Sequence, residues 1–389
     1  MNTKIIAVAV VAIVAVAGIG VGLALANNDN KSSGITITDG SGKTITIDKA
    51  LSNVAVINKN IPRVMVMYGI DSTITCYHWG EGTFPDIESR EDIVSLGTYY
   101  TPSVETLLEK KVEAVLCPVS SMTLYASYQT ACENVGIKVI RLDCNGSTLL
   151  DDMKKVSTIF GEPKKAVDVL NEYQANYDKI VEAVANKIES ASAEKLDFML
   201  CITSDQFNSV YNTSSAASNT FSKILGKNFT SYTDLSTKGV TNKFDTGTIE
   251  TIHEHMDKIG ILIVRPGSKD VTLTKYNTAY KQIVGDASHP VTQEAPAVAN
   301  GQAYVLNSNL YSGIGVSMGL LIMAEKVYGD FSVTLTFNGT EKTYEGLSDM
   351  PSAVADFCDA YYPGVFTAGN VLAASYAAGS YSGVAFVTY

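Results

Sequence analysis

The stretch IFGEPKKAVDVLNEYQANYDKIVEAV, residues 159–184, decides how the chain is organised. After the break Gly161-Glu162-Pro163, apolar residues recur every three or four positions, and no further Gly or Pro occurs until past Ser192. This is the period of an α-helix, and we assign residues 161–192 to one linker helix. At about 1.5 Å per residue, the roughly 26 residues that carry the pattern make a helix of about 40 Å. Such a helix is too long for a crossover inside one small sheet, and it is long enough to connect two lobes.

Short buried strands alternate with helices on both sides of this helix. The order strand, helix, strand is typical of parallel sheets whose faces are covered by helices. The sequence therefore predicts an α/β fold with two Rossmann-like lobes, residues 35–160 and 193–330, whose mostly parallel sheets are joined by one long rigid α-helix. The predicted strands are Ile74–Tyr77, Ala114–Cys117, Lys138–Leu142, Phe198–Ile202, Ile259–Val264 and Ala303–Leu306, and the predicted helices are Ser103–Lys111, Leu124–Asn134 and Thr248–Met256.

Two β-hairpins flank this alternating pattern. The first, ITITDGSGKTITI at residues 35–47, alternates apolar and polar residues around an Asp-Gly-Ser-Gly turn, and a short strand and a helix from Ile61 follow it. The second spans residues 331–344 around Asn-Gly, and a helix near 348–362 and a Gly/Ala/Tyr-rich tail come after it. The sequence assigns no role to this C-terminal part, residues 331–389.

The N-terminus carries an export signal. Met1–Lys4 is positively charged, Ile5–Ala26 is an unbroken apolar run, and a polar linker, residues 27–34, follows. The run is close to the ~20 residues that span a bilayer, which favours an uncleaved signal anchor over a signal peptide cleaved after Ala26. No cysteine lies near the end of the run, which excludes a bacterial lipoprotein box. We therefore expect a protein at the cell surface or in the extracytoplasmic space, anchored in the membrane by residues 5–26, or secreted if residues 1–26 are removed.

The composition of the chain excludes several further classes of protein. The 389 residues are 46% hydrophobic and 18% charged, as in globular proteins and unlike disordered chains. A net charge of -11 argues against a nucleic-acid partner. The six cysteines form no C-x-x-C pair, which predicts neither a zinc site nor a dense disulfide framework. We expect mostly buried thiols, and one or two disulfides remain open.

Ligand contacts are expected just after the strands, because ligands of open α/β sheets gather at the C-terminal ends of strands. The aromatic residues among these positions would suit a flat or apolar ligand held between two lobes, although loop aromatics also pack on one another. Arg265 is expected either to face a carboxylate or phosphate of the ligand or to form a surface ion pair. The candidates are Asn58, Asn60, Tyr77, His78, Trp79, Tyr99, Tyr100 and Ser120 in the first lobe and Ser204, Tyr211, Arg265 and Tyr311 in the second.

The sequence predicts no metal site and no catalytic residue. A bare metal ion needs several His and carboxylate ligands that converge on one point. His253-Glu254-His255 has the wrong spacing to place both rings on one face of a helix, and we interpret it as an exposed helix face. Cysteines spaced to bind a cluster and a convergent acid/base set are likewise not evident. We therefore do not expect an enzyme.

The order of several motifs resembles that of the class III substrate-binding proteins of ABC importers, which capture cobalamin, haem and iron–siderophores. The first hairpin and the linker helix are similar to those of this family, and two related stretches resemble its "G…P-s-x-E" motif in the two lobes. The missing lipid-attachment cysteine and the C-terminal hairpin depart from the family pattern. Besides residues 35–47 and 159–184, the resemblance rests on LGTYYTPSVETLLEKKVEAVLCP (96–118), DTGTIETIHEHMDKIGILIV (245–264) and VTQEAPAVANGQAYVLNSNLYSGIGVSMGLLIMAEKVYG (291–329).

The resemblance implies a solute-binding protein without a cofactor of its own. Its ligand would be an iron or cobalt chelate, that is, an iron–siderophore, a haem or a corrinoid, bound between the lobes and delivered to an ABC permease. His78, Tyr77 or Tyr99 would then be able to supply one axial bond to the metal of the chelate. The residues do not select among these chelates. An enzyme on the same architecture, chelatase-like or nitrogenase-like, and a ligand sensor are the alternatives.

The resemblance also assigns a role to two glutamates, Glu105 in P-S-V-E-T-L-L and Glu250 in G-T-I-E-T-I. In the family, the glutamate at this position of each lobe pairs with arginines of the permease. Taken alone, each is an ordinary first-turn glutamate, which is favoured near the positive end of a helix. We expect both to contact the permease.

Overall fold

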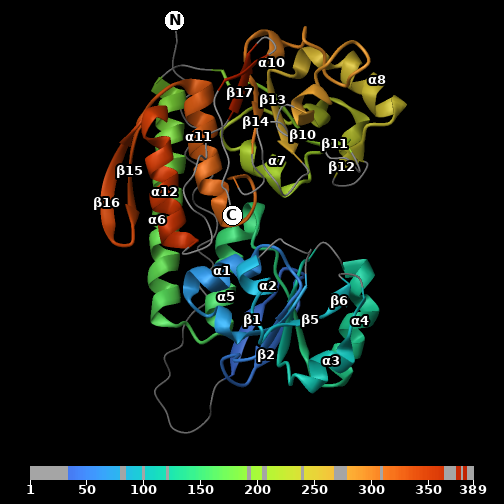
Figure 1. The fold of residues 1–389 in the computed structure, drawn as a ribbon, viewed down its shortest axis with the longest axis vertical. Helices are drawn as coiled ribbons and strands as arrows, with labels where there is room; N and C mark the ends of the chain where they lie inside the picture. The colour runs from blue at the N-terminus through green and yellow to red at the C-terminus, as the bar shows by residue number, and fades with distance from the viewer. Residues whose placement is uncertain are drawn as a thin grey trace, which may run out of the picture. The chain divides into compact units, whose positions relative to one another are not determined.

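The computed structural model describes residues 34–78, 85–98, 101–119, 122–190, 194–203, 208–237, 241–266, 278–306, 310–362, 374–377 and 380–382. All of them belong to one compact unit, Gly34–Tyr389 (Figure 1). Residues 5–26 lie outside the described part. None of the helices described combines the length and the apolar composition that a membrane span requires.

The first lobe is built on a five-stranded sheet with strand order β5-β4-β3-β8-β9, and every pairing in it is parallel. Strands β3, β4 and β8 are almost entirely buried, which explains their continuous apolar sequences. A separate hairpin, β1 and β2, precedes the sheet. The strands are β1 (Ile35–Thr38), β2 (Thr44–Ile47), β3 (Val54–Val56), β4 (Ile74–Tyr77), β5 (Val94–Ser95), β6 (Gly97–Thr98), β7 (Thr101–Pro102), β8 (Ala114–Cys117) and β9 (Lys138–Arg141).

Helices cover this sheet, and their ends follow from local sequence. Helix α1 has Pro62 in its first turn, where the missing N–H costs nothing, and it ends at Gly69, whose φ of 70° suits glycine. Helix α5 lies against α1, and it was not predicted from the sequence. The helices of this lobe are α1 (Ile61–Tyr68), α2 (Pro85–Glu88), α3 (Val104–Glu109), α4 (Met122–Asn134) and α5 (Leu149–Ile159), with a 3₁₀ turn η3 (Gly146–Thr148) before α5.

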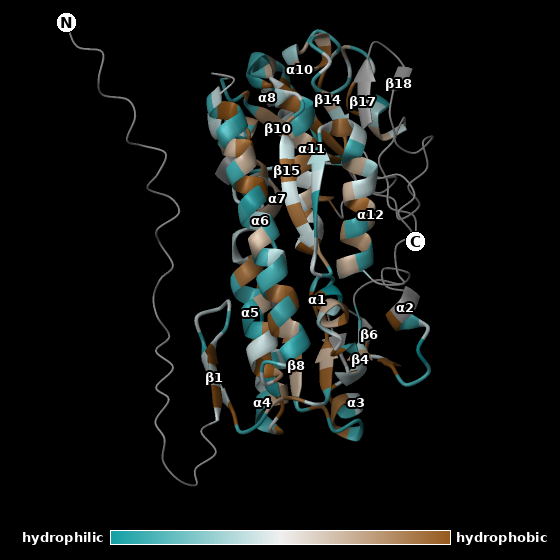
Figure 2. Cartoon of the chain, turned by 90° about the vertical axis from the view of Figure 1, so that its left-hand side faces the viewer, coloured by the Kyte–Doolittle hydropathy of each residue, from teal (hydrophilic) through white to brown (hydrophobic). Residues whose placement is uncertain are grey.

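The long helix α6, Lys164–Ser190, lies where the linker helix was expected. Its buried residues, which include Tyr173, Asn176, Tyr177 and Ile180, recur at helical spacing and form one stripe. Figure 2 shows this helix running past helices of both lobes. It packs against α1 and α5 of the first lobe and against α11 (Val316–Tyr328) of the second.

The second lobe has a seven-stranded sheet with strand order β12-β11-β10-β13-β14-β17-β18. Its centre, β10, β13 and β14, is parallel, but the other four strands pair antiparallel. The expectation of a mostly parallel sheet is therefore wrong for this lobe, because β11 returns beside β10 after a short connection and two strands of the tail extend the other edge. The strands are β10 (Phe198–Thr203), β11 (Asn208–Tyr211), β12 (Thr241–Lys243), β13 (Ile261–Pro266), β14 (Ala303–Val305), β17 (Ala374–Ala377) and β18 (Ser380–Ser382).

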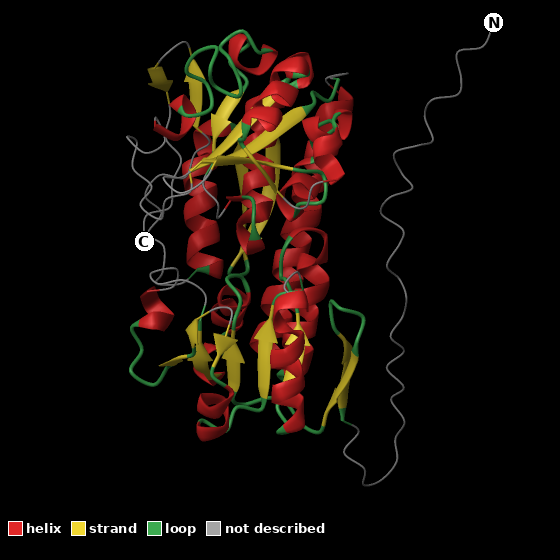
Figure 3. Cartoon of the chain, turned by 90° about the vertical axis from the view of Figure 1, so that its right-hand side faces the viewer, coloured by secondary structure: helices red, strands yellow, loops and turns green. Residues whose placement is uncertain are grey.

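Helices of the second lobe flank this sheet (Figure 3). They are α7 (Ala216–Phe221), α8 (Thr246–Glu254), α10 (Pro296–Ala299) and α11, with a 3₁₀ turn η8 (Gly313–Gly315) before α11. The C-terminal part then forms a hairpin of β15 (Ser332–Phe337) and β16 (Thr340–Glu345), a 3₁₀ turn η9 (Leu347–Asp349) and the helix α12 (Met350–Tyr361). An α/β fold with parallel strands in both lobes is thus confirmed.

The buried residues form three apolar clusters. One includes one sheet face of each lobe together with α1, α6, α11, β15 and α12, so that it is continuous across both lobes. The other two belong to the opposite sheet faces, one in each lobe. All six cysteines are buried and free, which confirms the buried thiols and leaves no disulfide.

One buried residue opposes folding at high pH. Glu325 of α11 is 1% exposed, and neither of its carboxylate oxygens has a hydrogen-bond partner among the described residues. Burial raises the pKa of Glu325 to about 8; Asp330 and Asp349 add to this rise, and Lys187 opposes it. The pKa in the unfolded chain is about 4.3. The folded protein therefore keeps a proton that the unfolded chain releases, and stability falls as the pH rises from about 4 to 8.

We expect Glu325→Gln, which is neutral at every pH, to remove this dependence. At pH 8 to 9 the variant should be more stable than the parent by about 2 kcal/mol, which corresponds to several degrees in Tm, and at pH 5 the difference should be small. Thermal unfolding between pH 5 and 9 measures it. Glu182→Gln, on the exposed side of α6, is the matched control. Parallel curves of Tm against pH for parent and Glu325→Gln would contradict the assignment.

Candidate ligand-binding site

The loop between β3 and α1 is held in place by two of the predicted residues. Asn58 is 3% exposed; its Nδ2 donates to the carbonyl of Leu142 at 3.0 Å, and its Oδ1 accepts from the N–H groups of Asn60 at 2.6 Å and Ile61 at 3.1 Å. Asn60 Nδ2 donates to the carbonyl of Asp143 at 3.0 Å. These contacts occupy both amide groups, so that Asn58 and Asn60 shape the loop that presents the residue between them, Lys59.

The same loops of the first lobe meet the second lobe. Asn145 Oδ1 accepts from the N–H of Gly313 at 3.0 Å, and a Cβ at Gly313 would lie 3.0 Å from Asn60 Oδ1. Gly146, with a φ of +57°, approaches Ala216 of α7 so closely that a Cβ there would come within 2.8 Å of the alanine Cβ. The two lobes are therefore in direct contact beside Lys59.

Three predicted residues of the second lobe come together at the C-terminal end of the sheet. Arg265 of β13 donates from Nη1 to the Tyr211 hydroxyl at 2.7 Å, and its guanidinium carbon lies 5.6 Å from the ring centroid of Tyr311. Tyr311 is 2% exposed and packs against Phe221. The Nε of Arg265 and the Tyr311 hydroxyl are buried and have no hydrogen-bond partner in the part of the chain that is described. The cluster thus retains hydrogen-bonding capacity.

Lys59, between Asn58 and Asn60, adds a second positive charge to this cluster. Burial, with a smaller contribution in the same direction from the guanidinium of Arg265, lowers the pKa of the Lys59 ammonium to about 8. The two residues therefore come close enough to repel each other, although they belong to different lobes. Neither forms an ion pair with a carboxylate among the described residues. The position of Lys59, directly after a buried strand, was the available signal.

The remaining residues that were predicted to bind ligand are in the core, half-buried or outside the described residues. Tyr77 is 4% exposed and belongs to the core cluster of the first lobe, so it is not an open loop residue. His78 is half-buried, and burial lowers its pKa while Glu88 acts in the opposite direction. Trp79, Tyr99, Tyr100, Ser120 and Ser204 lie outside the described residues.

His253 and His255 do not form an exposed helix face, so this expectation was wrong. Both rings are partly buried. His253 Nε2 lies 2.6 Å from the carbonyl oxygen of His289, and His255 Nδ1 lies 3.1 Å from that of Thr251. Within the described residues, no group of three His, Cys, Asp or Glu side chains is arranged to hold a metal ion.

The two glutamates expected to contact a permease are both exposed. Glu105 is in the first turn of α3, where the Ser103 side chain caps the helix by accepting from the N–H of Thr106. Helix α8 begins at Thr246 and is capped by Asp245, so Glu250 lies in its second turn and not in the first as expected. Their exposure leaves both carboxylates open to a partner.

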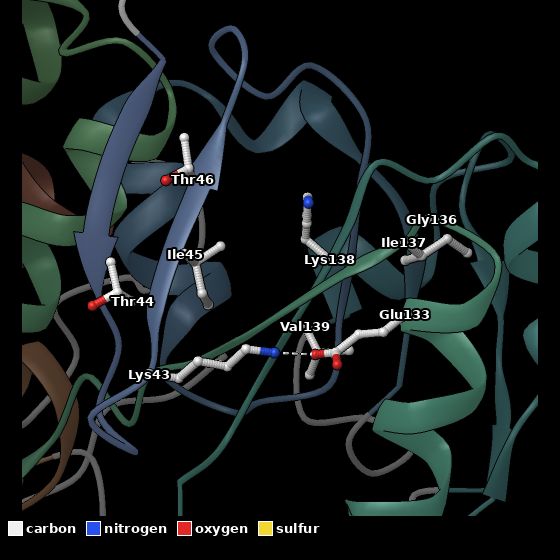
Figure 4. Close-up of a pocket in the computed structure, with 9 residues that line it drawn as sticks. All are labelled: Lys43, Thr44, Ile45, Thr46, Glu133, Gly136, Ile137, Lys138 and Val139. Atoms are coloured by element: carbon white, nitrogen blue, oxygen red, sulfur yellow. Dashed lines mark hydrogen bonds and ion pairs between the residues drawn. The ribbon is translucent and has the colours of Figure 1, made fainter.

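A cavity of about 240 Å³ lies elsewhere, between the hairpin β1–β2 and the edge strand β9 (Figure 4). Lys43 and Glu133 form an ion pair across it at 2.5 Å. None of the residues that line it was predicted to bind ligand. The candidate site is therefore the cluster of Lys59, Tyr211, Arg265 and Tyr311.

Fold and site together define a two-lobed α/β binding protein. The family model for periplasmic binding proteins matches residues 75–310, which is more than half of the chain, and the chain belongs to this family. This confirms the resemblance to class III substrate-binding proteins that was drawn from the sequence motifs. A search of curated proteins finds no match.

Solved structures share the fold at low sequence identity. A periplasmic binding protein from Veillonella parvula is 16% identical, with a TM-score of 0.60 over 77% of this chain and 99% of that chain. A periplasmic heme-binding protein from Pseudomonas aeruginosa is 12% identical, with a TM-score of 0.53 over 76% and 98%. The iron uptake ABC transporter substrate-binding protein PiuA from Streptococcus pneumoniae is 15% identical, with a TM-score of 0.53 over 76% and 99%.

Proposed function

We propose that this protein captures an anionic iron chelate, a ferric siderophore or a haem, between its two lobes and delivers it to an ABC permease. The observation that carries the proposal is the approach of Lys59 to Arg265 from opposite lobes without a carboxylate partner among the described residues. A buried Lys59 ammonium beside the Arg265 guanidinium is costly, because burial and the like charge both disfavour the charged form of the lysine. An anion placed between them removes that cost.

The three chelates differ in the charge that they present to the site. Haem carries two propionates, and many ferric siderophores carry net negative charge, whereas the amide side chains of a corrinoid are neutral. The unpaired Arg265 Nε and Tyr311 hydroxyl add donors for the same oxygens, because both are N–H or O–H groups. The structural neighbours from P. aeruginosa and S. pneumoniae, named for haem and for iron uptake, support the same ligand class. The site therefore favours an iron chelate over a corrinoid.

Export and delivery complete the proposal. Residues 5–26 would hold the protein at the outer side of the membrane, and Glu105 and Glu250, exposed on helices of different lobes, would bind basic residues of the permease. The periplasmic binding protein family supports a location outside the cytoplasm and delivery to a permease. We propose no catalytic activity, because the family to which the chain belongs is one of periplasmic binding proteins.

A ligand screen tests the proposal. We expect haemin or a ferric tris-catecholate to bind with one-to-one stoichiometry in equilibrium dialysis and to be recovered unchanged, while cyanocobalamin does not bind. Fluorescence of the single tryptophan, Trp79, supplies a second readout. Binding of cyanocobalamin alone would overturn the ligand class, and conversion of the chelate to a product would favour the enzyme.

A further inference from the structure

The C-terminal segment, residues 331–362, comprises β15, β16, η9 and α12, and we call it the brace. The hairpin of β15 and β16 is attached to α6 by one side chain, which forms the two hydrogen bonds that the backbone of a neighbouring strand would form. Asn176, 3% exposed on α6, donates from Nδ2 to the carbonyl of Thr336 at 2.5 Å and accepts at Oδ1 from the N–H of Thr336 at 2.8 Å. A buried amide with both functions satisfied fixes the register of the hairpin on the helix.

The β-turn between β15 and β16 is also attached to α6, one helical turn before Asn176. The carboxylate of Glu172 accepts from the backbone N–H groups of Asn338 at 3.1 Å and Gly339 at 2.8 Å, and the Tyr361 hydroxyl donates to it at 3.2 Å. At the other end, Lys187 Nζ donates to the carbonyl of Asp330, just before the brace begins. The brace is therefore held along about four turns of α6.

Aromatic rings fill the space between the hairpin, α12 and α6. The Tyr361 ring lies 5.0 Å from Phe357, 5.8 Å from Phe337 and 5.4 Å from Tyr173 of α6, all with edge-to-face geometry. Such pairs prefer a fixed mutual orientation, and buried rings of this size leave little free volume. The brace and α6 therefore pack as one rigid layer, which Figure 2 shows from the side of the hairpin.

Helix α12 extends this layer to both lobes. It lies against α11 of the second lobe and against α1 of the first. At the contact with α1, the guanidinium carbon of Arg63, a residue only 5% exposed, lies 6.0 Å from the ring centroid of Tyr362. Residues of all these elements belong to the core cluster that is continuous across both lobes. Movement of one lobe relative to the other would have to open that core.

We propose that the brace, which departs from the family pattern, is what locks the two lobes in one relative position. The brace joins the lobes at α1 and α11, and the Asn145–Gly313 hydrogen bond joins them again beside the candidate site. Two separate attachments exclude rotation about either one alone. This inference concerns motion in the ligand-free protein and does not depend on the identity of the ligand.

Distances between spin labels on the two lobes test the inference. Glu109→Cys on α3 and Glu254→Cys on α8 are exposed sites in different lobes, and the six native thiols are buried. We expect a narrow distance distribution in the ligand-free protein by double electron–electron resonance. Phe357→Ala, which removes a ring from the centre of the brace, should at least double the width of the distribution. Lys179→Ala, which removes the exposed Lys179–Glu341 pair, is the control and should leave it unchanged.

A second variant keeps the test decisive if Phe357→Ala fails to fold. Arg63→Met removes the cation from α1 and leaves the packing of the brace on α6 intact, and it should broaden the distribution in the same direction. A folded Arg63→Met or Phe357→Ala protein with the narrow distribution of the parent would overturn the proposal. A broad distribution in the parent would also overturn it.

Discussion

The double substitution Lys59→Gln with Arg265→Gln should lower the affinity for an anionic iron chelate by about a hundredfold to ten-thousandfold. Each residue would form a charge-assisted hydrogen bond with the ligand, and such bonds contribute about 1.5–3 kcal/mol each where water is largely excluded. Equilibrium dialysis with the chelate identified in the screen measures the loss. The fold should persist, because the two cations repel each other in the ligand-free protein and their removal relieves that repulsion.

Proton linkage at Lys59 supplies a second readout of the same prediction. The Lys59 pKa of about 8 in the free protein should rise when an anion binds, so the complex takes up a proton. Affinity should therefore be constant below about pH 7 and fall above pH 8, by at most tenfold per pH unit. Lys59→Arg keeps its charge throughout this range and should abolish the dependence. Affinity that does not change with pH in the parent would contradict the role of Lys59.

Reversing both exposed glutamates, Glu105→Arg with Glu250→Arg, should abolish uptake while affinity for the ligand in solution stays the same. The two residues lie on α3 and α8, in different lobes, so a permease with two basic patches would lose both attractions and meet repulsion at both. A single reversal should only weaken uptake, because an exposed ion pair contributes about 1 kcal/mol or less. Transport of radiolabelled iron chelate into cells measures the effect.

The same helices offer a matched control for this experiment. Glu109 and Glu254 are exposed on α3 and α8, near the C-terminal ends of the two helices. Their double reversal changes the net charge by the same amount and should leave uptake unchanged. Equal loss of uptake in both double variants would show that net charge, and not these two positions, governs delivery. Full uptake by the exported Glu105/Glu250 variant would end the docking proposal.

Part of the candidate site was predictable from the ends of strands. Arg265 and Tyr311 follow predicted strands of the second lobe, Tyr211 is the last residue of β11, which was not predicted, and the structure brings all three into contact. The rule was less successful in the first lobe, where Tyr77 is in the core. It also named Asn58 and Asn60, which hold the loop around Lys59, because asparagine side chains that hold a loop have the same sequence pattern as asparagines that bind a ligand.

The local elements were determined by the sequence itself. Apolar residues at helical spacing define α6, and alternating or continuous apolar runs define β1, β2, β4 and β8, because the period of side chains along a helix or strand is a property of the backbone. The same local signals define the C-terminal hairpin and α12. They do not say what these elements pack against, since an apolar face fits many partners.

The candidate site and the contacts between distant segments depend on the tertiary structure alone. Lys59 and Arg265 lie far apart in the chain, and only the packing of the two lobes brings their charges close enough to lower the pKa of the lysine. The brace on α6 and the addition of β17 to β14 likewise depend on contacts between distant segments. Pairing of this kind depends on the summed packing of many side chains, which no local period encodes. The sequence by itself thus determined which elements form, and the tertiary structure determined which residues become a site.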